Sequence, residues 1–154
     1  MRRVVKLGGA ALLLAACAGG IRPSYAPFPQ AVRDTIQAAP PAVVTAMLSA
    51  IAAEGMRVQW QSPAEGYIET QWYDLVSRQS GSFDRGSPER FIRLRFFVDP
   101  MGTDASTVIG EAVSVRTVDP SVLPRDAEMM LPPGHAGRGF LDRVLRQAKA
   151  AVAG

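Results

Sequence analysis

With 154 residues, of which 47% are hydrophobic, the chain is long enough for one domain with a core of its own. It carries 17 Lys or Arg, 14 Asp or Glu, one Cys and one His. The single Cys excludes an internal disulfide framework and cysteine-rich zinc sites, and the single His excludes multi-histidine metal sites, so we predict neither a metal nor a cofactor.

The N-terminus has the pattern of an export signal. A positive region comes first, made of Arg2, Arg3 and Lys6. The apolar stretch over residues 7–16 is too short to span a bilayer but has the length of a signal-peptide core. It ends in Leu14-Ala15-Ala16-Cys17, which resembles the lipobox of bacterial lipoproteins. The alternative is an ordinary secretory signal followed by a chance cysteine.

The lipobox resemblance implies that residues 1–16 are a signal peptide cut before Cys17. The cysteine would then carry fatty acyl chains such as palmitate and anchor the protein to a membrane, which is its first expected partner. Ala18 stands where enteric sorting reads Asp as a signal for the inner membrane. The resemblance therefore favours the periplasmic face of the outer membrane.

Cleavage of the signal would change the net charge of the protein. Residues 1–16 hold three of the 17 basic residues, so 14 basic residues would remain against 14 acidic ones. The mature protein would be formally neutral and would lack any basic run. The basic isoelectric point of the precursor is therefore no evidence for nucleic acid binding, and we predict no nucleic acid partner.

Residues 17–30 are predicted to be a tether that follows the lipidated cysteine. They are rich in Pro and Gly and have no periodicity, and residues 18–30 in an extended form reach about 40 Å. A single domain then covers residues 31–154. It begins with a short edge strand over 31–38 and a helix over 42–54, which follows Pro40-Pro41 and is closed by Gly55.

The rest of the domain alternates between strands and turns. Apolar residues recur at strand spacing over 56–60, 67–73, 91–98 and 107–118. A polar loop over 76–89 and an irregular crossover over 119–139 lie between them, and a helix over 140–152 ends the chain. The order β-α-β-β-β-β-α predicts an α+β fold, with an antiparallel sheet of four to five strands and two helices packed on one face.

Strand alternation divides side chains between the two faces of this sheet. Ile92, Leu94 and Phe96 should face the core, and so should Trp60 and Trp72. The opposite face should carry a candidate interaction patch, because aromatic and Arg residues are enriched in interfaces: Tyr73, Arg93, Arg95 and Phe97. The alternative is that the loop over 76–89 or the crossover covers these four residues.

These features together resemble the repeated domains of the BamC (NlpB) lipoproteins. The shared features are the lipobox, the Pro-rich tether, a helix that ends in Ala-Glu-Gly, the segment MRVQW…GYIETQWYD and a long alternating strand. The resemblance covers residues 31–154, hence one such domain, and implies a helix-grip arrangement in which a second helix packs across the sheet. BamC has two such domains and a long unstructured segment that binds its partner, whereas the expectation here is one domain and a short tether, so the resemblance does not imply the partner of this chain.

No catalytic constellation is visible in the sequence. The lone His135 lies in a Gly-rich loop with no neighbour that spacing alone would fix as its partner. We therefore expect a non-enzymatic envelope lipoprotein that binds another envelope protein, as an accessory domain in outer-membrane assembly or maintenance. The alternative is a binder of a lipid or other apolar ligand between helix and sheet.

Overall fold

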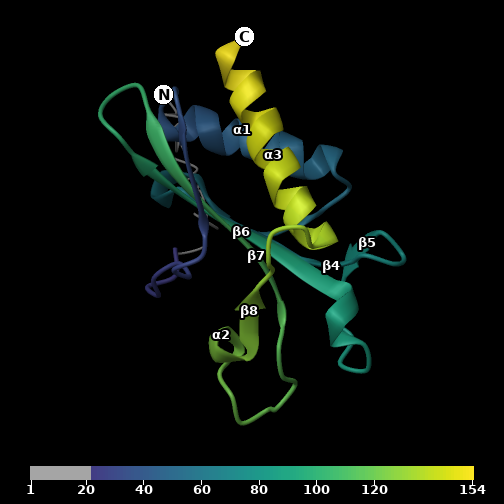
Figure 1. The fold of residues 1–154 in the computed structure, drawn as a ribbon. Coiled ribbons are helices and arrows are strands. Elements are labelled where there is room, and N and C mark those ends of the chain that lie inside the picture. Colours follow the sequence, from purple (N-terminus) through teal and green to yellow (C-terminus); the bar gives the residue numbers. More distant parts are fainter. Residues whose placement is uncertain (1–21) are drawn as a thin grey trace, which may run out of the picture.

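The computed structural model describes residues 22–154, so Cys17 and the predicted signal lie outside the described residues (Figure 1). The strands are β1 (Val32–Ile36), β2 (Val58–Ser62), β3 (Tyr67–Thr70), β4 (Trp72–Asp74), β5 (Gln79–Gly81), β6 (Phe91–Pro100), β7 (Ser106–Val115) and β8 (Glu128–Met130). The helices are α1 (Pro40–Ala53), α2 (Pro124–Ala127) and α3 (Ala136–Ala153), with 3-10 turns η1 (Pro63–Glu65) and η2 (Pro88–Arg90).

The strands form one antiparallel sheet, which confirms the predicted α+β class. The main path runs β1-β7-β6-β3-β2, while β4 and β5 extend from β6 and β8 pairs with β7. The described chain has eight strands, more than the four to five predicted. Short strands that form inside the predicted loop and crossover, β5 and β8, account for part of the difference.

Helices α1 and α3 lie together on one side of the sheet (Figure 1). The core between them and the sheet is a single cluster of buried side chains. It includes Val44, Met47 and Ile51 from α1, Leu141, Val144 and Leu145 from α3, and Ile92, Leu94 and Phe96 from β6. The apolar residues at helical spacing and those at strand spacing therefore meet as the sequence predicts.

Helix α3 approaches the sheet very closely at two glycines. A Cβ atom on Gly110 of β7 would lie 2.8 Å from Leu141 Cδ1. A Cβ atom on Gly137 would lie 2.6 Å from Leu131 Cδ1 and 2.8 Å from Ile92 Cγ2. Both distances are shorter than van der Waals contact, so the space between α3 and the sheet is filled by protein atoms.

Helix α3 begins four residues before the predicted start because His135 caps it. The Gly137 N–H donates to His135 Nδ1 over 3.0 Å, which satisfies one of the amides that the first helical turn leaves free. Histidine is not among the usual N-cap residues. The sequence-based start at Phe140 was therefore too late.

The predicted strand over 67–73 is broken, and the break reverses its faces. Between Glu69, which is opposite Arg95, and Tyr73, which is opposite Ile92, this strand advances four residues while β6 advances three, and the extra residue falls where β3 ends at Thr70 and β4 starts at Trp72. Tyr73 consequently faces the helices, where its ring centroid lies 5.1 Å from that of Phe140. Trp72 turns to the other face, so its predicted core position is wrong.

A second irregularity displaces Trp60. The pairing of β2 with β3 shifts between Val58 and Trp60, so Val58 opposes Thr70 while Trp60 opposes Glu69. Val58 packs against the core, whereas Trp60 is 54% exposed. The prediction that Trp60 faces the core is therefore wrong, because a bulge of one residue moves a side chain to the opposite face.

Candidate functional site

The sheet face opposite the helices is crossed by residues 22–31, which we call the N-terminal strap. Arg22 holds its first end: its guanidinium donates to both carboxylate oxygens of Asp99, over 2.6 and 3.2 Å, and to the Glu65 carbonyl over 3.0 Å. The Arg22 amide also donates to the Glu65 carboxylate. The part of the predicted tether from residue 22 onward is therefore in contact with the domain.

The middle of the N-terminal strap is held by Arg125. Its guanidinium carbon lies 4.5 Å from the Tyr25 ring centroid and 3.6 Å from that of Phe28. Arg125 Nη2 also donates to the Ala26 carbonyl over 3.2 Å. Cation–π contacts of this kind suit Arg, whose flat guanidinium can stack on a ring while it keeps its hydrogen bonds.

Beneath the N-terminal strap lies a group of ionised side chains that we call the buried charge cluster: Glu69, Arg95, Glu111, Arg125 and Glu128. Arg95 is 4% exposed and Glu111 is fully buried. Arg95 Nε lies 2.6 Å from Glu69 Oε2, and its two Nη atoms lie 2.5 and 2.6 Å from the Glu128 oxygens. Both Nη atoms of Arg125 lie 2.8 Å from Glu111.

Strand register explains why these charges meet. Arg95 of β6 is directly opposite Glu69 of β3 and Glu111 of β7, so the three form one row across the sheet. Glu128 is added by β8 and Arg125 by α2, both within the predicted crossover. The strap closes the cluster, since the Phe28 N–H donates to Glu111 Oε1 over 2.6 Å.

The environment shifts three pKa values in this region. Burial lowers the pKa of Arg95, but hydrogen bonds and attraction from Glu128 and Glu69 outweigh it and raise the pKa above its usual value. Burial lowers the pKa of Arg93 more than attraction to Glu69 raises it. Burial first, and then Tyr25 and Glu69, raise the pKa of Tyr67.

These contacts leave the buried charge cluster no free acid or base. Each of its three carboxylates accepts from at least one Arg, and Glu111 also accepts the strap amide. Removal of one member of such a buried network leaves an unpaired charge and is strongly destabilising. The cluster therefore joins the strap, the sheet and the crossover, and its arrangement is that of a structural network.

The predicted patch residues do not form one exposed surface. Arg95 is in the buried charge cluster, and Phe97 is 1% exposed beneath Arg22, whose guanidinium lies 5.3 Å from its ring centroid. Tyr73 is on the helix side of the sheet. Arg93 is partly buried and lies 4.3 Å from the Trp72 ring. The covering element over Arg95 and Phe97 is the N-terminal strap, which the sequence pattern did not suggest.

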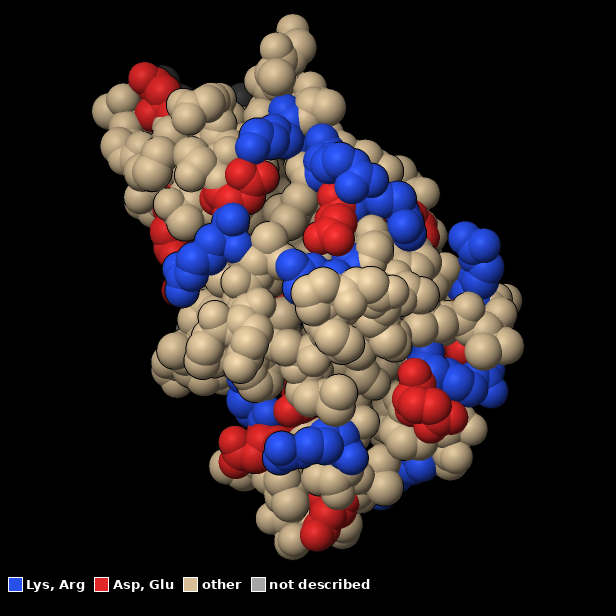
Figure 2. Space-filling view, viewed as in Figure 1, with Lys and Arg blue, Asp and Glu red and all other residues tan. Residues whose placement is uncertain are grey.

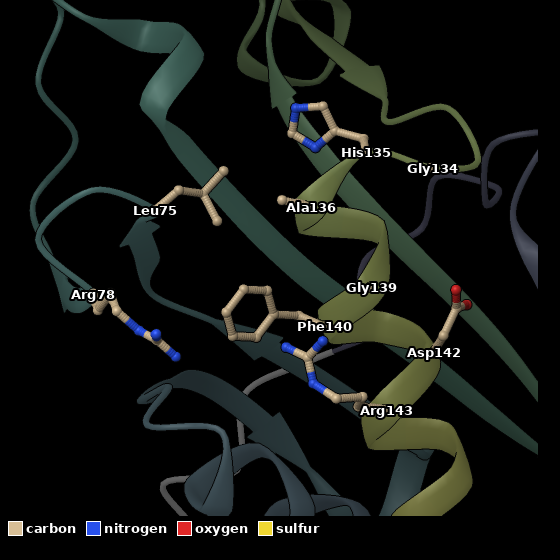
Figure 3. Close-up of a pocket in the computed structure, with 9 residues that line it drawn as sticks. All are labelled: Leu75, Arg78, Gly134, His135, Ala136, Gly139, Phe140, Asp142 and Arg143. Atoms are coloured by element: carbon tan, nitrogen blue, oxygen red, sulfur yellow. The ribbon is translucent and has the colours of Figure 1, made fainter.

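A separate hollow of about 460 Å³ lies beside His135, at the start of α3 (Figure 3). Figure 3 shows Arg78, Phe140 and Arg143 among the residues that line it, and the Arg143 guanidinium carbon lies 4.4 Å from the Phe140 ring centroid. Arg143 donates to Glu54 over 2.9 Å, and His135 Nδ1 accepts the Gly137 amide. The residues that line this hollow include no Ser, Thr, Cys or Lys that could pair with His135 as a nucleophile with its base.

One edge of the sheet carries an exposed aromatic side chain. Within residues 22–154, β2 pairs with β3 alone, so its other side has unpaired backbone donors and acceptors. Trp60 is exposed there, and its strand neighbours Gln59 and Gln61 are exposed as well. Open edges with such side chains can accept a strand from another chain.

Over the face drawn in Figure 2, acidic and basic side chains alternate, and neither sign forms a large patch. Among the described residues, no three His, Cys, Asp or Glu side chains are grouped as a metal site would require. None of the described helices has the length and apolar character needed to cross a membrane.

No protein-family model matches the chain, and no curated protein matches its sequence.

Proposed function

We propose that this chain is a bacterial lipoprotein, anchored in the cell envelope through acylated Cys17, whose domain acts through contacts with another envelope protein. The observation that carries the proposal is the lipobox Leu14-Ala15-Ala16-Cys17, in which the chain's single cysteine occupies the position that acylation requires. We further propose the periplasmic face of the outer membrane as its location and outer-membrane assembly or maintenance as its process.

The edge of β2 is the surface that best suits a protein contact. Trp60 is 54% exposed on a strand whose outer backbone groups have no partner within the described residues. Exposed Trp residues contribute large binding energies at interfaces, and an unpaired edge hydrogen-bonds an extended segment of any sequence. A partner that adds a strand beside β2 and packs an apolar side chain on Trp60 would satisfy both features.

The likeness to BamC domains also belongs to this proposal. The described domain has α1 and α3 on one face of an antiparallel sheet, an arrangement compatible with a helix grip. Extra strands and the N-terminal strap distinguish it from the arrangement that the resemblance implies. The likeness supports an accessory role and does not identify the partner.

The alternative function, a binder of an apolar ligand between helix and sheet, has less support. The residues that would line such a site, among them Leu141, Ile92 and Phe96, are buried in one continuous core cluster. Gly110 and Gly137 lack the room for a single added carbon atom. A ligand site needs a few hundred Å³, so α3 would have to leave the sheet to form one.

The interaction is tested by placing a photo-crosslinking amino acid at Trp60 in living cells. Val76 is the matched control, because it is also apolar and is 70% exposed. We expect one discrete crosslinked product from position 60 and none from position 76. Equal crosslinking from both positions, or none from position 60, would contradict a contact at the edge of β2.

A further inference from the structure

We infer that the anchored domain stands end-on, with the end of the sheet that carries η1 and the β6–β7 turn facing the lipid surface. The inference rests on the proposed acylation of Cys17. It also rests on an independent feature of the fold, the attachment of Arg22. The inferred partner of this end of the domain is a bilayer surface.

Arg22 fixes where the chain leaves the domain. Its guanidinium is paired with Asp99, at the end of β6, and it bonds both the carbonyl and the carboxylate of Glu65 in η1. Val98 N–H donates to Gly66 O over 2.7 Å, so η1 and the end of β6 are joined to each other. The exit point therefore belongs to the rigid sheet.

Covalent geometry limits the distance from that point to the membrane. Five residue steps separate Cys17 from Arg22, and a chain spans at most about 3.3–3.6 Å per residue, or roughly 17 Å in any conformation. The predicted free tether of residues 18–30 would have reached about 40 Å. Attachment of the strap therefore reduces the largest possible distance between the domain and the membrane by more than half.

The opposite end of the sheet lies well beyond this reach. From Asp99 to Phe91, β6 runs for eight residue steps, which corresponds to roughly 26 Å at about 3.3 Å per residue. Figure 1 shows β4, β5, α2 and β8 away from the β6–β7 turn, beyond the middle of the sheet. Those elements should therefore point away from the bilayer.

The chemistry of the near end is compatible with a lipid surface. Met101, in the β6–β7 turn, is 45% exposed, and such an apolar side chain can enter the boundary between headgroups and acyl chains. Asp99 and Glu65 would repel anionic lipids, but both are bonded to Arg22. Arg22 therefore offsets part of the negative charge at this end, which also carries the exposed Asp104 of the β6–β7 turn.

The test measures the distance of two surface sites from the membrane. Because Cys17 is the chain's single cysteine and acylation blocks its thiol, Met101→Cys and Leu123→Cys each provide one site for a fluorophore. Leu123, just before α2, is 70% exposed. Each acylated protein is placed in phosphatidylethanolamine–phosphatidylglycerol vesicles that carry a quencher on the headgroups. We expect strong quenching at position 101 and little at position 123.

A change at Arg22 tests the attachment itself. In Arg22→Ala the next firm contact is Tyr25, so the reach grows by three residues, or about 10 Å, and quenching at position 101 should fall. Arg33→Ala is the matched control, since Arg33 is exposed on β1 and should leave quenching unchanged.

The intact mass of each protein separates the possible failures. A protein without acyl chains would overturn both the proposed function and this inference. An acylated protein with equal quenching at the two sites, or with stronger quenching at position 123, would overturn the orientation alone. Unchanged quenching in Arg22→Ala would show that Arg22 does not set the distance between the domain and the membrane.

Discussion

Arg95 and Glu128 form a bidentate ion pair across 33 residues of sequence, with both guanidinium Nη atoms 2.5 and 2.6 Å from the carboxylate oxygens. The pair is buried, and it joins the central strand β6 to the short strand β8 within the predicted crossover. A segment that reads as irregular in sequence is thereby held against the sheet. The same arginine also binds Glu69, so it connects three strands.

Replacement of Arg95 should therefore destabilise the fold. Arg95→Met keeps much of the side-chain volume but leaves Glu69 and Glu128 without their main counter-charge, and we expect a loss of about 3–5 kcal/mol in the free energy of unfolding. Urea titration followed by circular dichroism measures it. Arg33→Met, the same change at an exposed site, should cost under about 0.5 kcal/mol. Equal losses in the two variants would contradict the role of the cluster.

Gly66 should be far less replaceable than Gly102. Both have a positive φ, +62° and +75°, so Ala at either site costs about 1–2 kcal/mol in backbone conformation. A Cβ atom on Gly66 would also lie 1.9 Å from Val98 O, whereas one on Gly102 meets no atom within 4 Å. We expect Gly66→Ala to shift the thermal midpoint much further than Gly102→Ala. Similar shifts would mean that η1 does not contact β6 as described.

The stacking of Phe28 on Arg125 should hold the N-terminal strap against the sheet. Phe28→Ala removes the ring on which Arg125 stacks, and we expect a loss of about 0.5–2 kcal/mol. Hydrogen exchange should then become faster for the amides of residues 22–31, with little change in α1. A strap that exchanges as fast in the wild-type protein as in the variant would contradict its attachment.

The stability of the fold should fall in acid partly through Asp74. Burial raises the pKa of this carboxyl. Hydrogen bonds from the Val76 amide, Arg90 and Ser77 lower the pKa by more than burial raises it, so its value is about 2. The pKa of an unfolded Asp is about 3.9, so this stabilisation is complete above roughly pH 4 and is lost as the pH falls towards 2.

Comparison with Asp74→Asn isolates this contribution. The wild-type protein should be more stable than the variant at pH 6, and the difference in unfolding free energy should shrink steadily between pH 4 and pH 2. A difference that stays constant over that range would show that the Asp74 carboxylate is not responsible.

Sequence patterns predicted the elements that regular periodicity defines. Helix α1, the alternation of β6 and the helix over 140–152 all follow from apolar spacing, and Ile92, Leu94 and Phe96 are buried as expected. The patterns failed where one residue breaks the period. An extra residue between Glu69 and Tyr73 reverses the faces of β4, and the bulge before Trp60 exposes that side chain.

The buried charge cluster also could not be predicted from the sequence alone. Strand alternation placed Arg93 and Arg95 on the face opposite the helices, which is where polar side chains are normally solvated. The burial of Arg95 depends on the N-terminal strap, whose Pro and Gly content is typical of a free tether. Three aromatic or cationic residues at strap positions, Arg22, Tyr25 and Phe28, are the signal that could have indicated contact with the sheet.

The central claim, a domain anchored through Cys17, is tested most directly by the intact mass of the protein extracted from the envelope. We predict a chain that starts at Cys17 and carries acyl chains, and a Cys17→Ser variant that keeps residues 1–16 and gains no lipid. A wild-type protein recovered without detergent, with an unmodified Cys17 thiol, would contradict the account.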